Sequence, residues 1–491
     1  MKLSLQKAAK NDPVAITAGH GDSVSPCWVM ASFSLSMLLT SLSTSIANVA
    51  LPAIAQSFSA SFQQVQWVVL SYLLAITTLI VSVGRFSDMT GRRQLLLFGI
   101  FLFTLASMLC SAATSLWLLI AARAGQGIGA AIMMALTMAY IGTTVSSEKS
   151  GSAMGLLGTM SAIGTALGPS LGGVLVHGLG WRSIFFINLP LGALTYFLAF
   201  RSLPMDREAS VIVRARFDLL GTVLLILTLI AFALALTLKP NNFGLLNVTL
   251  LAAAAVSLVG FILVEAKAEA PLIQMALLRN PILCAGFAMG ILVTTVVMAT
   301  LVVGPFYLSG ALALTAGQVG LVMSSGPIVA ALSGIPAGRL VDRIGADRVI
   351  VIGLIMMAVG CAVFALLPTR FGVPGYIAPL LVVTAGYALF QAANNTAVLT
   401  NTGLEQRGVI SGLLNLSRNL GLIIGASFMG AIFAFGSSVG SAANSIISAQ
   451  PDAVAAGMRM TFTVGEIIVV IAIIVACVSR GLFRRRLNAS C

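Results

Sequence analysis

The chain has 491 residues, of which 58% are hydrophobic and only 8% are charged. Because soluble globular domains carry about 25% charged residues, the composition excludes a soluble protein and indicates an integral membrane protein. We attribute the formal net charge of +13 to basic residues gathered on one side of a membrane, and we expect no nucleic-acid partner.

Apolar stretches of about 20 residues, the length that crosses a bilayer as a helix, follow one another along the chain. Strands of a membrane barrel would be about ten residues long and alternate in polarity, so we predict an all-α membrane protein. The polar residues 1–26 are interpreted as an N-terminal tail without a cleaved signal peptide. We predict fourteen spans, at 27–51, 67–86, 95–114, 117–140, 151–176, 182–201, 218–238, 245–265, 281–304, 318–337, 347–367, 375–398, 408–434 and 462–482.

The distribution of lysine and arginine predicts the side on which each loop lies. With the N-terminus in the cytoplasm, about 21 basic residues fall on the cytoplasmic side. The opposite side holds only four, namely Arg182, Lys239, Arg370 and Arg459. We therefore expect a multi-pass protein of a cell inner membrane, with both termini in the cytoplasm.

A charged motif occurs twice, which indicates an internal repeat. Residues 84–91 read Gly-Arg-x-x-Asp-x-x-Gly after the second span, and residues 338–345 repeat the pattern after the tenth. Two halves of six spans would place the second copy after the eighth span, so we infer two inserted helices. We thus predict a cytoplasmic tail (1–26), an N-terminal six-helix bundle (27–201), linkers with two inserted helices (202–280), a C-terminal six-helix bundle (281–482) and a basic cytoplasmic tail (483–491).

Four stretches in order carry a family resemblance. They are the loop motif at 84–93, Arg-x-x-Gln-Gly at 123–127, the glycine-rich stretch at 164–173 and the stretch at 181–192 that opens the sixth span. Together they resemble the major facilitator superfamily, and more narrowly its fourteen-span drug:proton antiporters of the EmrB/QacA type. The resemblance implies the major facilitator fold, alternating access and proton-coupled export of drugs or toxic metabolites, hence multidrug efflux and drug resistance.

The resemblance also implies roles for two motifs. The loop motif would form a conformational lock between neighbouring helices; the alternative is a solvated loop with weak surface ion pairs. The candidate lock residues are Gly84, Asp88, Gly91, Arg92, Arg93, Asp342 and Arg343. The antiporter motif, whose small residues at four-residue spacing predict close helix packing, would seal the cavity against leakage; its residues are Gly164, Gly168, Pro169, Gly172 and Gly173.

Charged side chains inside spans are candidates for coupling transport to protons or substrate. An isolated arginine at a helix centre costs about 2.5–3.5 kcal/mol, so Arg123 should face a cavity or a partner, and Gln126 lies one turn away. Arg123 is either a proton-linked or anion-sensing group, or is satisfied by backbone carbonyls. Arg418 could instead extend to the cytoplasmic surface. Glu466 is the clearest carboxylate within a span, and either carries protons or lies near the extracellular surface.

Polar residues within spans are candidates for the substrate cavity, although ordinary packing is the alternative for any single Met or Tyr. We expect Ser43, Asn48, Tyr72, Gln391, Asn394 and Asn395 to line it, beside Met133 and Met134. Ser43 stands where the family usually has an aspartate. Without that acid, and with Arg123 and Arg418 in spans, we expect neutral or anionic amphipathic substrates.

The sequence therefore predicts a secondary active transporter whose partners are a small amphipathic molecule, protons and the lipid bilayer. It lacks a phosphate-binding loop for ATP and any catalytic or metal-binding constellation, so we expect neither an enzyme nor a cofactor. The alternative is a metabolite uptake permease or a specific metabolite exporter on the same fold. The chain would act either as a monomer or with a periplasmic adaptor and an outer-membrane channel.

Overall fold

The computed structural model describes residues 26–144, 147–203, 219–238, 244–268, 280–366, 368–400, 407–438 and 450–490, and all regular elements in these ranges are helical. The elements are α1 (Pro26–Ser57), α2 (Phe62–Thr90), α3 (Arg92–Ser111), α4 (Leu116–Thr144), α5 (Ser147–Leu179), α6 (Ser183–Phe186), α7 (Asn188–Ser202), α8 (Leu219–Thr237), α9 (Leu245–Glu265), α11 (Pro281–Gly310), α12 (Ala316–Ile344), α13 (Ala346–Leu366), η1 (Thr369–Phe371), α14 (Gly372–Thr400), α15 (Arg407–Ile424), η3 (Gly425–Met429), α16 (Gly430–Ser438) and α17 (Pro451–Ser490).

The described residues contain fourteen helices long and apolar enough to cross a membrane, which confirms the predicted count. The eighth span, Leu245–Glu265, has the predicted bounds, and most others differ by a few residues. The last span is the exception, because α17 begins at Pro451, eleven residues before the predicted start at 462, and stays helical to Ser490. Asp452 and Arg459 interrupt the hydropathy of its first turns, which hid this part of the helix from the sequence prediction.

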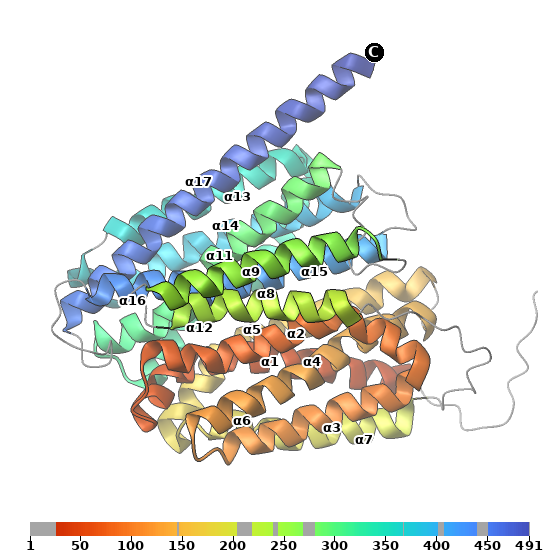
Figure 1. The fold of residues 1–491 in the computed structure, drawn as a ribbon, viewed down its shortest axis with the longest axis horizontal. Coiled ribbons are helices and arrows are strands. Elements are labelled where there is room, and N and C mark those ends of the chain that lie inside the picture. Colours follow the sequence, from red (N-terminus) through yellow and green to blue (C-terminus); the bar gives the residue numbers. More distant parts are fainter. Residues whose placement is uncertain are drawn as a thin grey trace, which may run out of the picture.

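The helices form two groups that lie side by side (Figure 1). The first helix group comprises α1–α7, drawn in red to yellow, and the second comprises α11–α17, drawn in green to blue. The inserted pair α8 and α9 lies in front of the boundary between them. The α8 helix packs against α2 of the first group and against η3 of the second, and Trp67 Nε1 donates a hydrogen bond to Thr237 Oγ1 at 3.0 Å.

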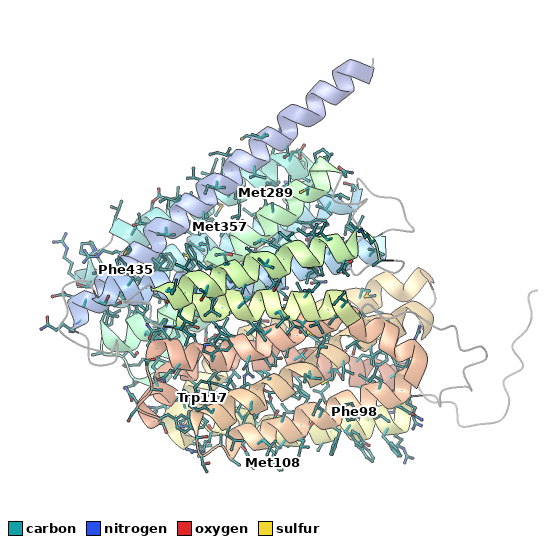
Figure 2. The ribbon with its side chains drawn as sticks, in the orientation of Figure 1. Phe98, Met108, Trp117, Met289, Met357 and Phe435 are labelled. Carbon is teal, nitrogen blue, oxygen red and sulfur yellow. The ribbon has the colours of Figure 1, made fainter. Side chains whose placement is uncertain are left out.

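The outer surface of the bundle is apolar, as a lipid-facing surface requires. On α3, Phe98 and Met108 project outward, and Trp117 at the start of α4 is 70% exposed (Figure 2). Met289 and Met357 are instead buried within the second group. Side chains of the same apolar type therefore serve both lipid contact and helix packing.

The repeated motif produces the same backbone turn in both groups. Gly91 separates α2 from α3 with φ 89° and ψ 135°, and Gly345 separates α12 from α13 with φ 88° and ψ 149°. Residues with a Cβ rarely adopt these angles, so glycine is required at the eighth motif position. Gly84 and Asp88 lie outside the residues whose side chains are described.

Candidate functional site: a central cavity and a buried arginine

A cavity of about 640 Å³ lies between the two helix groups, walled by α1, α2, α4 and α5 on one side and by α15 on the other. Its lining comes from the middle of α1, α2 and α5, from the second half of α4, and from α15 beginning at its first turn. The cavity therefore extends from the middle of the bundle toward the end that contains the α4–α5 junction and the start of α15. This volume falls in the range of small-molecule sites, about 300–1,000 Å³.

The first helix group supplies a mostly apolar wall with scattered hydroxyl groups. Met37 on α1 and Met134 and Met138 on α4 provide flexible, polarisable surfaces. Ser41 and Ser161 also line the cavity, and their hydroxyl oxygens are 2.6 Å apart, which joins α1 to α5. This wall suits an apolar ligand body of adaptable shape.

The second wall is a polar stripe along α15. Ser411, Asn415, Arg418 and Asn419 line the cavity at spacings of four, three and one residues, which places them on one helix face. Of these residues, the sequence analysis singled out only Arg418, and for coupling rather than for binding. The helical spacing of polar residues in 411–419 was the signal that could have identified the stripe.

The opposite half of the bundle is closed between the two groups. Phe62 of α2 contacts the rings of Phe306 on α11 and Phe433 on α16, at centroid distances of 4.7 and 5.2 Å. One turn further along α2, Gln66 Nε2 donates to the carbonyl oxygen of Ala426 in the π-helical turn η3, at 3.0 Å. These contacts leave the cavity without a passage between α2, α11 and α16 at this end.

The antiporter-motif glycines pack in two directions. A Cβ on Gly164 or Gly168 would overlap the backbone of α1 near Leu42 and Ile46, so the close packing that their spacing predicts is observed. Gly173 instead meets α12, because a Cβ there would lie 2.7 Å from the Cα of Gly320. Gly172 also packs against α1, and Pro169 contributes its carbonyl oxygen to the contact with Gly320.

Arg123 is fully buried in a hydrogen-bonded cluster inside the first helix group. Its Nε donates to the Val68 carbonyl oxygen at 2.9 Å, and its Nη1 donates to Ser43 Oγ at 3.2 Å and to Gln126 Oε1. Gln126 in turn donates to Ser107 Oγ at 2.7 Å. Oxygen atoms from three helices therefore engage Nε and Nη1 of this guanidinium, while its buried Nη2 has no hydrogen-bond partner among the described residues.

An aromatic ring completes the cluster. The Tyr72 ring lies 4.1 Å from Arg123 Cζ, a cation–π distance, and the Tyr72 hydroxyl donates to the Thr40 carbonyl oxygen at 2.9 Å. The same cluster holds Ser43, while Asn48 is buried on α1 and donates to the Thr44 carbonyl oxygen. A network spanning α1, α2 and α4 thus lies beside the cavity rather than on its wall.

The six residues expected to line the cavity are absent from its wall in this conformation. Ser43 and Tyr72 face Arg123, and Asn394 donates to the Gly286 carbonyl oxygen, which joins α14 to α11. Gln391 and Asn395 are half-buried on the same helix. Of the two methionines considered with them, Met134 lines the cavity and Met133 is buried behind it. A rotation of 100° per residue along a helix separates Ser43 from its neighbours Ser41 and Thr44, which do line the cavity.

The described lock residues lie at the helix ends. Arg93 donates to the Phe200 carbonyl oxygen at 2.7 Å, which ties the start of α3 to the end of α7, and Arg92 is half-buried beside it. Asp342 and Arg343 are exposed on the last turns of α12. Glu466 lies four turns into α17 beside Cys361 of α13, away from the cavity.

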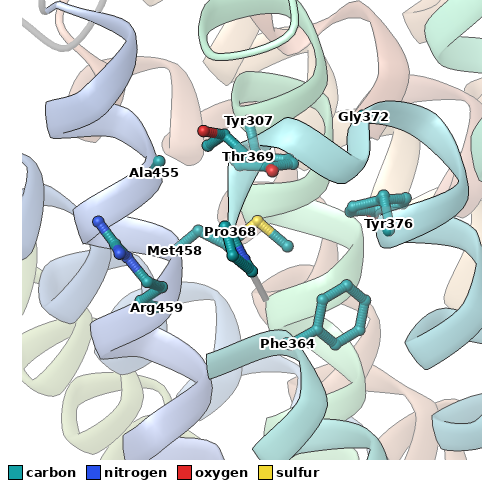
Figure 3. Close-up of a pocket in the computed structure, with 10 residues that line it drawn as sticks. Tyr307, Phe364, Pro368, Thr369, Gly372, Tyr376, Ala455, Met458 and Arg459 are labelled. Carbon is teal, nitrogen blue, oxygen red and sulfur yellow. The ribbon is translucent and has the colours of Figure 1, made fainter. Parts of the chain in front are cut away.

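A second recess lies at the closed end, between α11, α13, α14 and α17 (Figure 3). Tyr307, Tyr376 and Arg459 line it, and its volume is about 20 Å³. That space holds about one water molecule, so this recess is not a candidate for an organic substrate. Among the described residues, no group of three or more His, Cys, Asp or Glu side chains could hold a metal ion.

Comparisons with known proteins assign this chain to a family. The model of the Major Facilitator Superfamily matches residues 33–426. The chain is 30% identical over 406 residues to the riboflavin transporter RibZ of Clostridioides difficile, covering 82% of this chain and 86% of the relative. It is 32% identical over 404 residues to the multidrug resistance protein Stp of Mycobacterium tuberculosis, covering 82% and 74%.

Solved structures share the fold. A bacterial homologue of the human lysosomal transporter Spinster, in an inward-facing and unoccupied conformation, aligns with a TM-score of 0.67 at 14% identity, over 95% of this chain and 99% of the other. The nucleoside transporter NupG aligns with a TM-score of 0.63 at 14% identity, over 93% and 100%. At this identity the likeness concerns the fold alone.

Proposed function

Since this chain belongs to the major facilitator superfamily, we propose that it is a proton-coupled antiporter of the fourteen-span EmrB/QacA type. It exports small amphipathic compounds, such as drugs or toxic metabolites, across the inner membrane of a bacterium by alternating access. The observation that carries this proposal is the cavity of about 640 Å³ between two helix groups, which contact each other at one end through Phe62 and Gln66. A relative that is a multidrug resistance protein supports the export role.

The orientation follows from the basic residues of the sequence. About 21 of them fall on the side that holds the α2–α3 and α4–α5 junctions, the side that we assign to the cytoplasm. The cavity then extends from the middle of the membrane toward the cytoplasmic side, where an exporter takes up its substrate. Both termini lie in the cytoplasm in this arrangement, and the α2–α3 junction with Asp88 and Arg92 forms the lock.

The Arg123 cluster is positioned to couple helix movement to the state of the cavity. Arg123 on α4 binds Ser43 on α1 and the backbone of Val68 on α2, so a shift of α1 against α2 must break or remake these bonds. Thr40 and Thr44 on α1 line the cavity, and Thr40 also accepts the bond from Tyr72. A substrate that moves α1 therefore changes the hydrogen bonds of the Arg123 guanidinium.

Transport into everted membrane vesicles tests the proposal. Vesicles from cells that produce the chain should accumulate an amphipathic fluorescent dye when their interior is acidified, and an uncoupler should release it. Vesicles that lack the chain provide the control. Accumulation that is unchanged by the uncoupler would contradict proton coupling, and no accumulation across a broad panel of compounds would contradict export.

A specific metabolite transporter is the second candidate, because the riboflavin transporter RibZ is as similar to this chain as the drug-resistance relatives are. The two candidates differ in selectivity and in direction. A deletion strain that loses resistance to several unrelated toxins supports multidrug export. A strain that instead fails to accumulate or to release a single metabolite supports the alternative.

A further inference from the structure

The charge of the cavity wall is confined to one side chain. Among the described residues that line the cavity, Arg418 is the single charged one, and none is Asp or Glu. The wall therefore carries one positive charge that no lining carboxylate balances. Hydroxyl groups, amides and apolar side chains make up the rest.

Arg418 lies deep within the span. It is eleven residues beyond Arg407, the first residue of α15, and at 1.5 Å per residue this is about 16 Å along the helix. That distance is about half of a 30 Å hydrocarbon core. An arginine at this depth is unfavourable unless it faces water or a partner, and here it is exposed to the cavity.

The guanidinium of Arg418 is available to a ligand. It forms no hydrogen bond or ion pair with any of the residues that the structure describes, in contrast to Arg123, whose Nε and Nη1 are both engaged. Asn419 next to it and Ser411 two turns away add neutral polar groups on the same wall. A carboxylate here can accept two parallel bonds from the planar guanidinium.

The opposite wall fits the other end of an amphipathic ligand. Met37, Met134 and Met138 face the cavity from α1 and α4, and methionine packs well against aromatic rings. An anionic group bound at Arg418 would thus place an apolar body against these methionines. An organic cation would find no described carboxylate on the wall and would be repelled by Arg418.

We propose that the cavity selects amphipathic monoanions, with Arg418 binding the carboxylate and the methionine wall binding the aromatic body. This inference rests on the proposed transport function only for its biological meaning, since binding can be measured without transport. Arg418 is a specificity-determining residue in this reading, and Arg123 remains a buried structural and coupling group.

Three ligands with one ring system test the inference. Radiolabelled 2-naphthoate, 2-naphthamide and 2-naphthylmethylammonium are each equilibrated with the purified full-length chain in detergent, with empty micelles as the blank. Charge-assisted hydrogen bonds are about twice as strong as neutral ones, so naphthoate should bind at least about tenfold more tightly than the amide, and the ammonium should bind most weakly. Arg418→Gln should reduce the preference for the carboxylate to within about twofold, while Arg418→Lys should retain part of it.

Arg370→Gln is the matched control, because Arg370 is an exposed arginine at the other end of the bundle and its removal leaves the cavity unchanged. A wild-type chain that binds the amide or the ammonium as tightly as the carboxylate overturns the inference. A carboxylate preference that survives in Arg418→Gln, or no binding of any of the three ligands, does so as well.

The same ligands separate this inference from the proposed function. If the ammonium is pumped into everted vesicles and naphthoate does not bind, export stands and anion selection falls. If naphthoate binds through Arg418 and no compound is pumped, anion selection stands and the transport function falls.

Discussion

The contact between α5 and α12 offers a sharp test of how the closed end is held. A Cβ built on Gly320 lies 2.5 Å from the carbonyl oxygen of Pro169 and 2.6 Å from the Cα of Gly173. Both neighbours are backbone atoms, so no side-chain rotation can make room. Gly320→Ala must therefore separate the two helices, which belong to different helix groups.

The size of the effect follows from the overlap. Ordinary contacts of a Cβ begin at 3.4 Å, so the helices must move apart by about 1 Å, a forced displacement of the kind that overpacking produces. Overpacking of this kind costs about 1–3 kcal/mol, which is about a 5- to 150-fold change in an equilibrium between two states. The closed arrangement of this end should lose population by that factor.

A disulfide across the same interface measures the closed population. A Cβ on Gly317 lies 3.5 Å from the Cβ of His177, within the range of disulfides, about 3.5–4.5 Å. In a cysteine-free background, His177→Cys with Gly317→Cys should form the bond rapidly under mild oxidation. Adding Gly320→Ala should slow bond formation by about fivefold or more, the lower end of the estimated shift.

Two controls accompany the measurement. Gly334→Ala on the same helix meets open space and should leave the rate unchanged. Gly178→Cys with Gly317→Cys should not form the bond, because the next residue along α5 points about 100° away from His177 and a Cβ on Gly178 meets open space. If the Gly320→Ala chain forms the disulfide and transports at wild-type rates, the close approach of α5 and α12 does not hold this end closed.

Other predictions follow from the remaining contacts. Gly345→Ala should destabilise the purified chain by about 1–3 kcal/mol because the φ of Gly345 is 88°. Gly338→Ala is the control, because Gly338 is helical and a Cβ there meets open space. Equal melting temperatures of the two variants would exclude backbone strain at Gly345. Gln66→Leu leaves the Ala426 carbonyl oxygen without its donor, an effect of about 1–3 kcal/mol, and should slow the same disulfide; an unaltered rate would count against this bond as a latch. Arg123→Lys cannot span its separate acceptors and should lower transport at least about tenfold while membrane insertion is retained; wild-type transport by that variant would remove Arg123 from the coupling network.

Several local features were predictable from the sequence. Spans could be counted because a chain in lipid must satisfy its backbone hydrogen bonds within each segment, so length and apolarity suffice. The repeated motif indicated an internal repeat, and its final glycines, Gly91 and Gly345, adopt almost the same backbone angles. Residues three apart on a helix are neighbours, which placed Gln126 beside Arg123 before any contact was known.

The composition of the cavity wall was not predictable in the same way. Ser43 and Tyr72 look like cavity residues in the sequence, yet they bind Arg123, while the stripe from Ser411 to Asn419 faces the cavity. The spacing of the polar residues in 411–419 was a signal for the α15 stripe, whereas a span that is apolar on nearly all sides gives no pattern that distinguishes the face toward lipid from the face toward a neighbour.

Hydropathy and motif spacing were thus enough to establish the class, the number of spans and the superfamily resemblance, because each depends on properties within a single segment. The rotation of each helix, the closed end between Phe62 and Phe433, and the exposure of Arg418 to the cavity depend on packing between segments far apart in the chain. Interhelical packing in lipid is governed by shape and by a few hydrogen bonds, and these appear when the helices are assembled.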